Sequence, residues 1–98
     1  MSIYLIAEIT VHDNERYKEY VGRVPALIEK HQGTYVVRGG QTAVKEGTWS
    51  PERLVVLQFP DRAHAEDFLK DPEYAPVAAI RHSAATTNLI LAEGYDGE

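Results

Sequence analysis

The sequence predicts an α+β domain in which a four-stranded antiparallel sheet carries two helices on one face. Three observations lead to this fold class. Four stretches alternate or run apolar as strands do, and two longer stretches carry apolar residues at helical spacing. They follow one another in the order βαββαβ, with turn residues between them. The length of 98 residues fits one domain covering residues 1–98.

The first strand is predicted over residues 3–11, where every second residue is apolar. Asp13 and its neighbours supply N-cap chemistry, and a helix is predicted over residues 14–31. Pro25 removes one backbone hydrogen bond of this helix, so we expect a kink there. Gly33 is expected to end the helix in the left-handed conformation.

Two further strands are predicted over residues 34–38 and 53–59, the first of them stopped by Gly39-Gly40. The second is apolar on both faces, which indicates that both faces are covered. The segment between these strands has no period. A loop of that length in so small a domain is often functional.

The second helix is predicted to begin at Pro60-Asp61 and to restart at Asp71-Pro72, with Asp71 as the N-cap and Pro72 in the first turn. It continues to about His82. The last strand is predicted over residues 84–93, and the acidic tail 94–98 is expected to fray. With right-handed crossovers, this order of elements gives the ferredoxin-like arrangement.

Apolar residues on both faces of the sheet predict a homodimer. Helices can cover one face only, yet Ile6, both faces of the strand 53–59, and Leu89 with Ile90 all require cover. The sheet of a second subunit would supply it. A chain of this length is also marginal alone, because it buries only about 60–65% of its unfolded surface.

The composition excludes several function classes. A formal net charge of −5 and scattered basic residues argue against binding of nucleic acid. The sequence has no cysteine, which excludes thiolate chemistry and fits a reducing compartment, so we expect a cytoplasmic protein. We expect no signal peptide at the N-terminus and no span long enough to cross a membrane. The histidines have no metal-ligand spacing, so no metal site is expected.

The long loop and its edges hold the most interesting polar residues: Arg38, Glu46, Trp49 and Arg53. Two arginines and a carboxylate around an aromatic ring could bind a small anion, with a guanidinium fork on a carboxylate. The structural alternative is that Glu46 pairs with one arginine to pin the loop, while Trp49 plugs the sheet edge.

Other candidates stand on the strands and helices. Glu8 lies on the face opposite the helices, where it would be a base if buried and a surface acid if not. Tyr17, Tyr20 and Tyr74 could bind a ligand or transfer a proton, although such tyrosines are usually core residues with a wet tip. Arg81 most simply complements the dipole of its helix, and it could also reach the loop acid.

Several motifs, spread over nearly the whole chain, resemble the domain of unknown function 1330 family of small bacterial proteins. They are the run from Gly33 to Arg38-Gly39-Gly40, Glu46-Gly47-x-Trp49-x-Pro51-x-Arg53, Phe59-Pro60, Ala65, Asp71-Pro72-Glu73-Tyr74 and Arg81.

The resemblance implies a dimeric α/β barrel, in which two ferredoxin-like sheets face each other. Relatives in that superfamily include cofactor-free antibiotic-biosynthesis monooxygenases and chlorite dismutase-like and EthD-like proteins. The positions that match the family pattern, and are therefore implied as site residues, are Arg38, Glu46, Trp49, Arg53, Tyr74 and Arg81.

The chain also departs from the family pattern. Gln58 stands where the family often has a glutamate, which removes any role for an acid at that position. Phe68, Leu69 and Asp71 stand where an aromatic pair and a serine are usual. No histidine suits a heme iron, and no cofactor is expected.

Three functions are compatible with these observations. The first is a dimer that binds a small anionic or aromatic compound through Arg38, Arg53 and Trp49, between the sheet and the helices. The second is a cofactor-independent monooxygenase or isomerase, in which an arginine stabilises a carbanion or enolate and Glu8, Glu46 or a tyrosine moves the proton. The third is a structural dimer without a ligand site.

Overall fold

The structure is a computed structural model and describes residues 2–95. One antiparallel sheet contains β1 (Ile3–Val11), β2 (Thr34–Arg38), β3 (Arg53–Phe59) and β4 (Ala85–Glu93) in the order β2-β3-β1-β4. The long first strand is central and pairs with β3 on one side and β4 on the other. The predicted bounds of β1, β2 and β3 are confirmed, and β4 begins one residue later than predicted.

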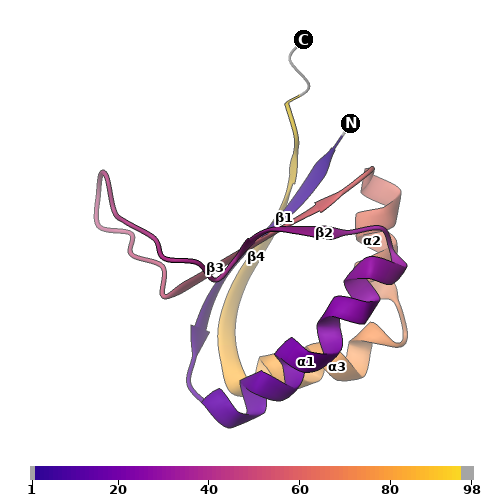
Figure 1. The fold of residues 1–98 in the computed structure, drawn as a ribbon, viewed down its shortest axis with the longest axis horizontal. Coiled ribbons are helices and arrows are strands. Elements are labelled where there is room, and N and C mark those ends of the chain that lie inside the picture. The colour runs from indigo at the N-terminus through magenta and orange to yellow at the C-terminus, as the bar shows by residue number, and fades with distance from the viewer. Residues whose placement is uncertain (1, 96–98) are drawn as a thin grey trace.

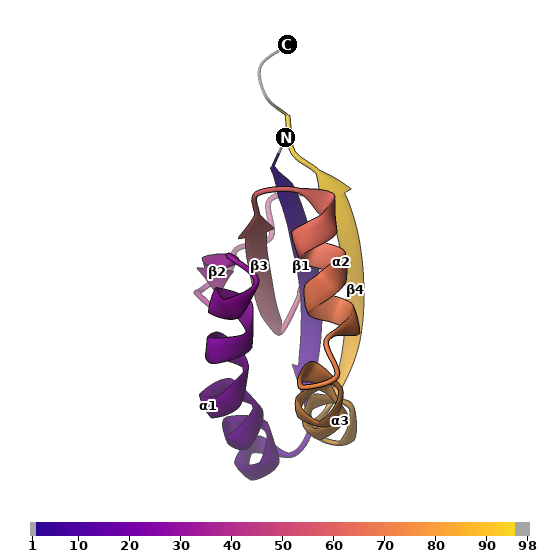
Figure 2. The same cartoon turned by 90° about the vertical axis from the view of Figure 1, so that its right-hand side faces the viewer.

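The helices α1 (Asn14–Lys30), α2 (Arg62–Lys70) and α3 (Tyr74–Ala84) all lie on one face of the sheet (Figures 1 and 2). The fold class predicted from the sequence is therefore confirmed, with the second helical segment divided in two at Asp71. Within residues 2–95, no helix combines the length and the apolar character that crossing a membrane requires.

The sequence prediction was wrong on the start of α3, which begins at Tyr74 and not at Pro72. Asp71 forms a turn ahead of the helix, since its carboxylate accepts the Glu73 N–H at 2.8 Å and its carbonyl accepts the Tyr74 N–H at 2.8 Å. The capping chemistry of the aspartate is thus present. It acts on the turn that leads into the helix.

The prediction that Gly33 takes the left-handed conformation was also wrong, because Gln32 takes it, at φ 62°. Gly33 has a different constraint. A Cβ at this position would lie 2.7 Å from the Phe59 ring and 2.8 Å from the Ile28 side chain. Glycine is required there for close packing of the end of α1 against β3. The helix itself runs on through Pro25.

The core lies between the helices and the inward side of the sheet. Phe59, Phe68 and Leu5 are its largest fully buried side chains. The rings of Phe59 and Phe68 lie 5.6 Å apart, and those of Phe68 and Tyr74 lie 4.4 Å apart. These aromatic contacts join β3, α2 and α3 and add to the stability from apolar burial.

The opposite face of the sheet carries no helix, and an apolar row crosses it between polar residues such as Glu8 and Asn88. Ile6 pairs with Val56 on one side and Ile90 on the other, so these three side chains form a row across that face. Ile90 is 59% exposed, and Val36 at the sheet edge is 52% exposed. The apolar character expected on both sides of the sheet is therefore present, and the structure covers one side only.

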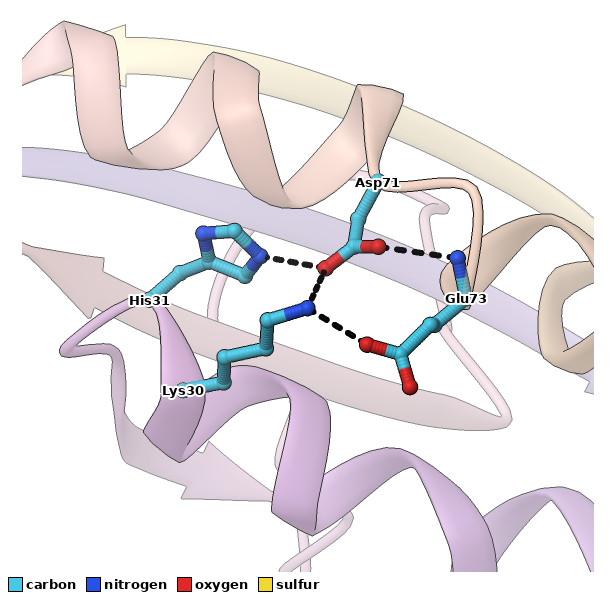
Figure 3. Close-up of polar contacts among 4 residues, drawn as sticks. All are labelled: Lys30, His31, Asp71 and Glu73. Atoms are coloured by element: carbon cyan, nitrogen blue, oxygen red, sulfur yellow. Dashed lines mark hydrogen bonds and ion pairs between the residues drawn. The ribbon is translucent and has the colours of Figure 1, made fainter.

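A polar cluster ties the end of α1 to the junction of α2 and α3 (Figure 3). The side chain of Asp71 is 4% exposed and accepts hydrogen bonds from Lys30 Nζ at 2.8 Å and His31 Nε2 at 2.7 Å. Lys30 also reaches Glu73, at 2.6 Å. Lys30, His31 and the Glu73 N–H, in that order, hold the pKa of the Asp71 carboxyl well below its usual range.

This cluster makes stability depend on pH through Asp71. Because its pKa is lower in the folded protein than in the unfolded chain, the stabilisation is present above about pH 4 and is lost as the pH falls further. We expect Asp71→Asn to lower Tm by several degrees at pH 7 and to flatten the fall of Tm on acidification. Thermal unfolding followed by circular dichroism from neutral pH downwards measures both effects.

Glu73→Gln is the matched control, since it removes a carboxylate from the same lysine at a side chain that is 70% exposed. Exposed ion pairs contribute little, so its Tm should stay close to that of the wild type. If the Tm of Asp71→Asn falls on acidification as steeply as that of the wild type, another group causes the acid sensitivity.

Candidate functional site

A cavity lies between the sheet and the helices, lined mostly by apolar side chains from β1, β3, α1 and α2. Water-sized molecules can be centred in about 50 Å³ of it, within an empty space of about 600 Å³ that also includes open solvent. The interior has room for a few water molecules, since one water needs about 10–15 Å³ on this measure. A larger ligand therefore occupies the mouth or moves the side chains there.

Three arginines line the cavity, each beside a tyrosine ring. The Arg38 guanidinium carbon lies 4.5 Å from the centroid of the Tyr35 ring, within cation–π range. Arg53 lies 5.4 Å from the Tyr17 centroid. Its Nε also donates to the Tyr17 hydroxyl at 3.1 Å. The cavity therefore has a cationic wall faced with aromatic rings.

The third arginine, Arg81, enters the cavity from α3. Its guanidinium carbon lies 5.6 Å from the Tyr20 centroid, and its Nη2 donates to the Tyr74 hydroxyl at 3.4 Å. Burial rises through the set: Arg38 is exposed, Arg53 is half-buried and Arg81 is buried. The cationic groups thus extend from the mouth of the cavity into its interior.

The arginines have no carboxylate partner in the described part of the chain. No ion pair among residues 2–95 involves Arg38, Arg53 or Arg81. No aspartate, glutamate or histidine of the described chain lines the cavity. Its positive charge is consequently uncompensated by side chains around it, which is the usual condition of a binding site for an anion.

Two of the cavity tyrosines, Tyr20 and Tyr35, stay neutral. Burial, followed by the neighbouring Tyr74, raises the pKa of Tyr20 far above its ordinary value. Burial also raises the pKa of Tyr35, against the opposing effect of Arg38. At neutral pH these hydroxyls therefore act as hydrogen-bond donors and acceptors and neither as counter-ions nor as bases.

Local backbone features place the two sheet arginines on the helix side. A β-bulge between Tyr35 and Val37 lets both Tyr35 and Arg38 face that side, although they are three residues apart. Gly39 then adopts a left-handed φ of 71°, and a Cβ there would collide with the Arg53 guanidinium. Glycine at the end of β2 thus leaves room for Arg53.

The sheet separates the residues that the sequence grouped together. Arg38, Arg53, Tyr74 and Arg81 all line the cavity. Glu8 and Trp49 lie on the opposite face, where Glu8 accepts hydrogen bonds from Trp49 Nε1 at 2.7 Å and from Asn88 Nδ2 at 3.1 Å. Glu46 lies with Trp49 in a second, open groove under the loop 39–52.

Two structural roles were expected in the loop: an ion pair of Glu46 with an arginine, and Trp49 as a plug at the sheet edge. Glu46 forms no ion pair with Arg38 or Arg53. Trp49 anchors the loop through Glu8 on the central strand, while its ring remains 60% exposed. Arg81 reaches no loop acid among the described residues. It is buried and faces the cavity.

Sequence reasoning missed Tyr35 as a cavity residue. Simple alternation along β2 would place Tyr35 and Arg38 on opposite faces, and the bulge that brings them together has no signal in the sequence. Tyr17 and Tyr20 could be recognised as candidates, because their hydroxyls are presented from a predicted helix. Within residues 2–95, no cluster of three or more histidine or acidic side chains could hold a metal ion.

These features define an α+β protein of ferredoxin-like fold with an arginine–tyrosine cavity between its sheet and its helices. The model of the family named Domain of unknown function (DUF1330) matches residues 2–95, so the chain belongs to that family. The comparison with curated proteins found no match.

Several solved structures are similar in fold. RPA0582, a protein of unknown function from Rhodopseudomonas palustris, superposes with a TM-score of 0.81 at 17% identity, over 97% of this chain and 83% of that one. SnoaB from Streptomyces nogalater, a cofactor-independent oxygenase, gives 0.69 at 18% identity, over 99% and 98%. A Bacteroides thetaiotaomicron protein, described as a possible oxidoreductase, gives 0.67 at 17%, over 95% and 97%. At these identities the similarity establishes the fold alone.

The contact between Glu8 and Trp49 predicts a fluorescence effect, because Trp49 is the one tryptophan of the sequence. Glu8→Ala removes the acceptor of the indole N–H and should free the loop. We expect greater quenching of Trp49 fluorescence by acrylamide, with a Tm close to that of the wild type. Glu46→Ala is the control, since this loop carboxylate has no hydrogen bond or ion pair within residues 2–95. Equal quenching in wild type and Glu8→Ala would show that the contact does not hold the loop.

Proposed function

We propose that the protein binds a small anionic aromatic compound in the cavity between the sheet and the helices. The observation that supports this most strongly is the set of arginines 38, 53 and 81 around an apolar cavity without a carboxylate from the described chain. An anion would neutralise guanidinium groups that have no carboxylate partner among the described residues. Guanidinium groups also bind carboxylates in a two-pronged geometry that fixes the orientation of the ligand.

The walls support an aromatic or otherwise flat ligand. Leu5, Val24, Leu57 and Phe68 form the apolar part of the lining, and the tyrosine rings lie beside the arginines. A planar molecule can stack on such rings while its acidic group contacts a guanidinium. The interior of about 50 Å³ is smaller than the cavity of about 150 Å³ that holds a benzene ring, so a ring can enter only if side chains at the mouth move.

A homodimer is the second part of the proposal. The uncovered face of the sheet, with its row of Val56, Ile6 and Ile90, would be buried against the same face of a second copy. Stable interfaces bury about 800 Å² on each partner and are apolar at their centre. The loop 39–52 would then flank the second copy. A cytoplasmic location remains our expectation from the cysteine-free sequence.

A cofactor-independent oxygenase or isomerase is the alternative. A cationic, apolar cavity favours it, because such surroundings stabilise a carbanion or enolate. However, neither Glu8 nor Glu46 lines the cavity, and Tyr20 stays protonated. An enzyme of this kind would therefore need a substrate that loses its proton without the help of Glu8, Glu46 or Tyr20. Binding is therefore the function that we prefer.

The proposal predicts that benzoate raises the Tm of the wild type and that Arg53→Ala weakens this effect. Hydrogen bonds to charged groups contribute about 1.5–3 kcal/mol, so the apparent Kd should rise about 10- to 100-fold. Thermal shift titration and calorimetry measure it. Arg23→Ala is the control, since this exposed arginine of α1 pairs with Glu19 at 3.8 Å. If benzoate affects neither protein, or if Arg53→Ala only unfolds the chain, a structural dimer without a ligand site is favoured.

The dimer predicts that Ile90→Arg produces monomers, because it places a charge at the centre of the apolar face. Sedimentation velocity at several concentrations measures the mass. The control is Ala63→Arg, which adds the same side chain to an exposed position of α2, on the other side of the sheet. A wild type that sediments as a monomer at all concentrations would contradict this part of the proposal.

A further inference from the structure

Arg81 carries a buried positive charge that has no ion-pair partner among the described residues. Arg81 is 6% exposed and stands in α3, with its side chain lining the cavity. Arginine is almost never buried unless it is paired. Transfer of an isolated charge from water into the protein interior costs several kcal/mol even after relaxation.

The neighbours of Arg81 do not balance its charge. Nη2 contacts the Tyr74 hydroxyl at 3.4 Å and His82 Nε2 at 3.5 Å. The ring of Tyr20 lies 5.6 Å from the guanidinium carbon. No carboxylate of residues 2–95 lies within ion-pair distance. A guanidinium has five N–H donors, so most of them lack an acceptor among these contacts.

The surrounding groups offer donors and few acceptors. Burial would lower the pKa of Arg81, but Tyr74 and Tyr20 outweigh that effect and raise it, so the guanidinium stays charged. Tyr20 remains protonated because its own pKa is far above neutrality. The hydroxyls of Tyr20 and Tyr74 and one permanent cation therefore meet at the cavity wall. An arrangement of this kind receives an oxyanion.

The remaining groups that face the site agree with this assignment. Across the cavity are Arg53 of β3 and Tyr35 of β2, and neither supplies a negative charge. Aromatic rings are close, since Phe68 and Tyr74 stack at 4.4 Å and Tyr17 and Tyr20 at 5.6 Å. An oxygen carried on an aromatic ring would reach Arg81 while its ring fills the apolar space.

We infer that Arg81 binds the ionised oxygen of a phenol or of an enol conjugated with an aromatic ring, with Tyr20 and Tyr74 as further hydrogen-bond donors. The ligand class of the cavity would then be weak oxygen acids bound as their anions. This inference rests on the proposed function and deepens it, since it names the ligand group that enters the buried part of the cavity. Arg38 and Arg53 would hold any second acidic group at the mouth.

The probe for this inference is 4-nitrophenol, whose ionised form absorbs visible light. Absorbance titration against pH, with and without the protein, measures the pKa of the bound phenol. A nearby cation should lower that pKa by about one unit or more. Arg81→Gln should abolish the shift and weaken binding about tenfold or more, while Arg81→Lys should retain part of the shift. Arg23→Gln, at the exposed pair with Glu19, should leave it unchanged.

A second pair of variants serves if Arg81→Gln fails to fold. Tyr20→Phe and Tyr74→Phe remove one donor each and keep the ring, so each should reduce the shift. An unshifted pKa for the bound probe in the wild type would overturn the inference. A pKa shift that remains in Arg81→Gln would overturn it as well. If Arg81→Gln does not fold, a full shift in both phenylalanine variants would have the same meaning.

Benzoate binding distinguishes a failure of this inference from a failure of the proposed function. If benzoate binds through Arg53 but the pKa of 4-nitrophenol does not shift, the cavity is an anion site in which Arg81 has no role.

Discussion

The central strand β1 supports the rest of the structure, because it pairs on both sides and its alternation divides the molecule into two halves. Side chains such as Leu5 and Ile9 point towards the helices and are buried there. Ile6 and Glu8 point the other way, to a face that no helix covers. Core and cavity therefore belong to one side of the sheet, whereas the apolar row and the Trp49 anchor belong to the other. The ligand binding and the self-association that we propose would therefore use different faces of the sheet.

On the helix side, the distribution of charge is the decisive property. The chain carries a net charge of −5, yet the cavity has arginines and no acidic side chain from the described residues. Ordinary surface arginines of this chain, such as Arg23 and Arg62, sit beside a glutamate one turn away. The cavity arginines lie beside tyrosine rings. A ring lowers the cost of placing a guanidinium in apolar surroundings without cancelling its charge, so the attraction for an anion persists.

The position of Arg81 depends on contacts far from the cavity. The Asp71 cluster joins the end of α1 to the turn before α3 (Figure 3). In α3, Arg81 then contacts the Tyr74 hydroxyl and lies beside the ring of Tyr20 on α1. Close packing at Gly33 fixes the same end of α1 against β3. The buried Asp71 carboxylate, with its three donors before the start of α3, thus helps to position the Arg81 guanidinium near the end of the same helix. Stability and the candidate site are linked through the orientation of two helices.

The bounds of the strands and the fold class followed from sequence alone, because alternation and helical spacing are local properties of the chain. Residue type and family motifs also identified Arg38, Arg53, Tyr74 and Arg81 as candidates, and all four line the cavity. Alternation along β1 also predicted that Glu8 lies on the face opposite the helices. The separation of these residues from Trp49 and Glu46 could not be predicted. The direction of a side chain depends on strand register, and the bulge after Tyr35 and the pairing of Arg53 with Ile9 are set by tertiary contacts. Residues close in sequence were therefore divided by the sheet, and residues distant in sequence came together around one cavity.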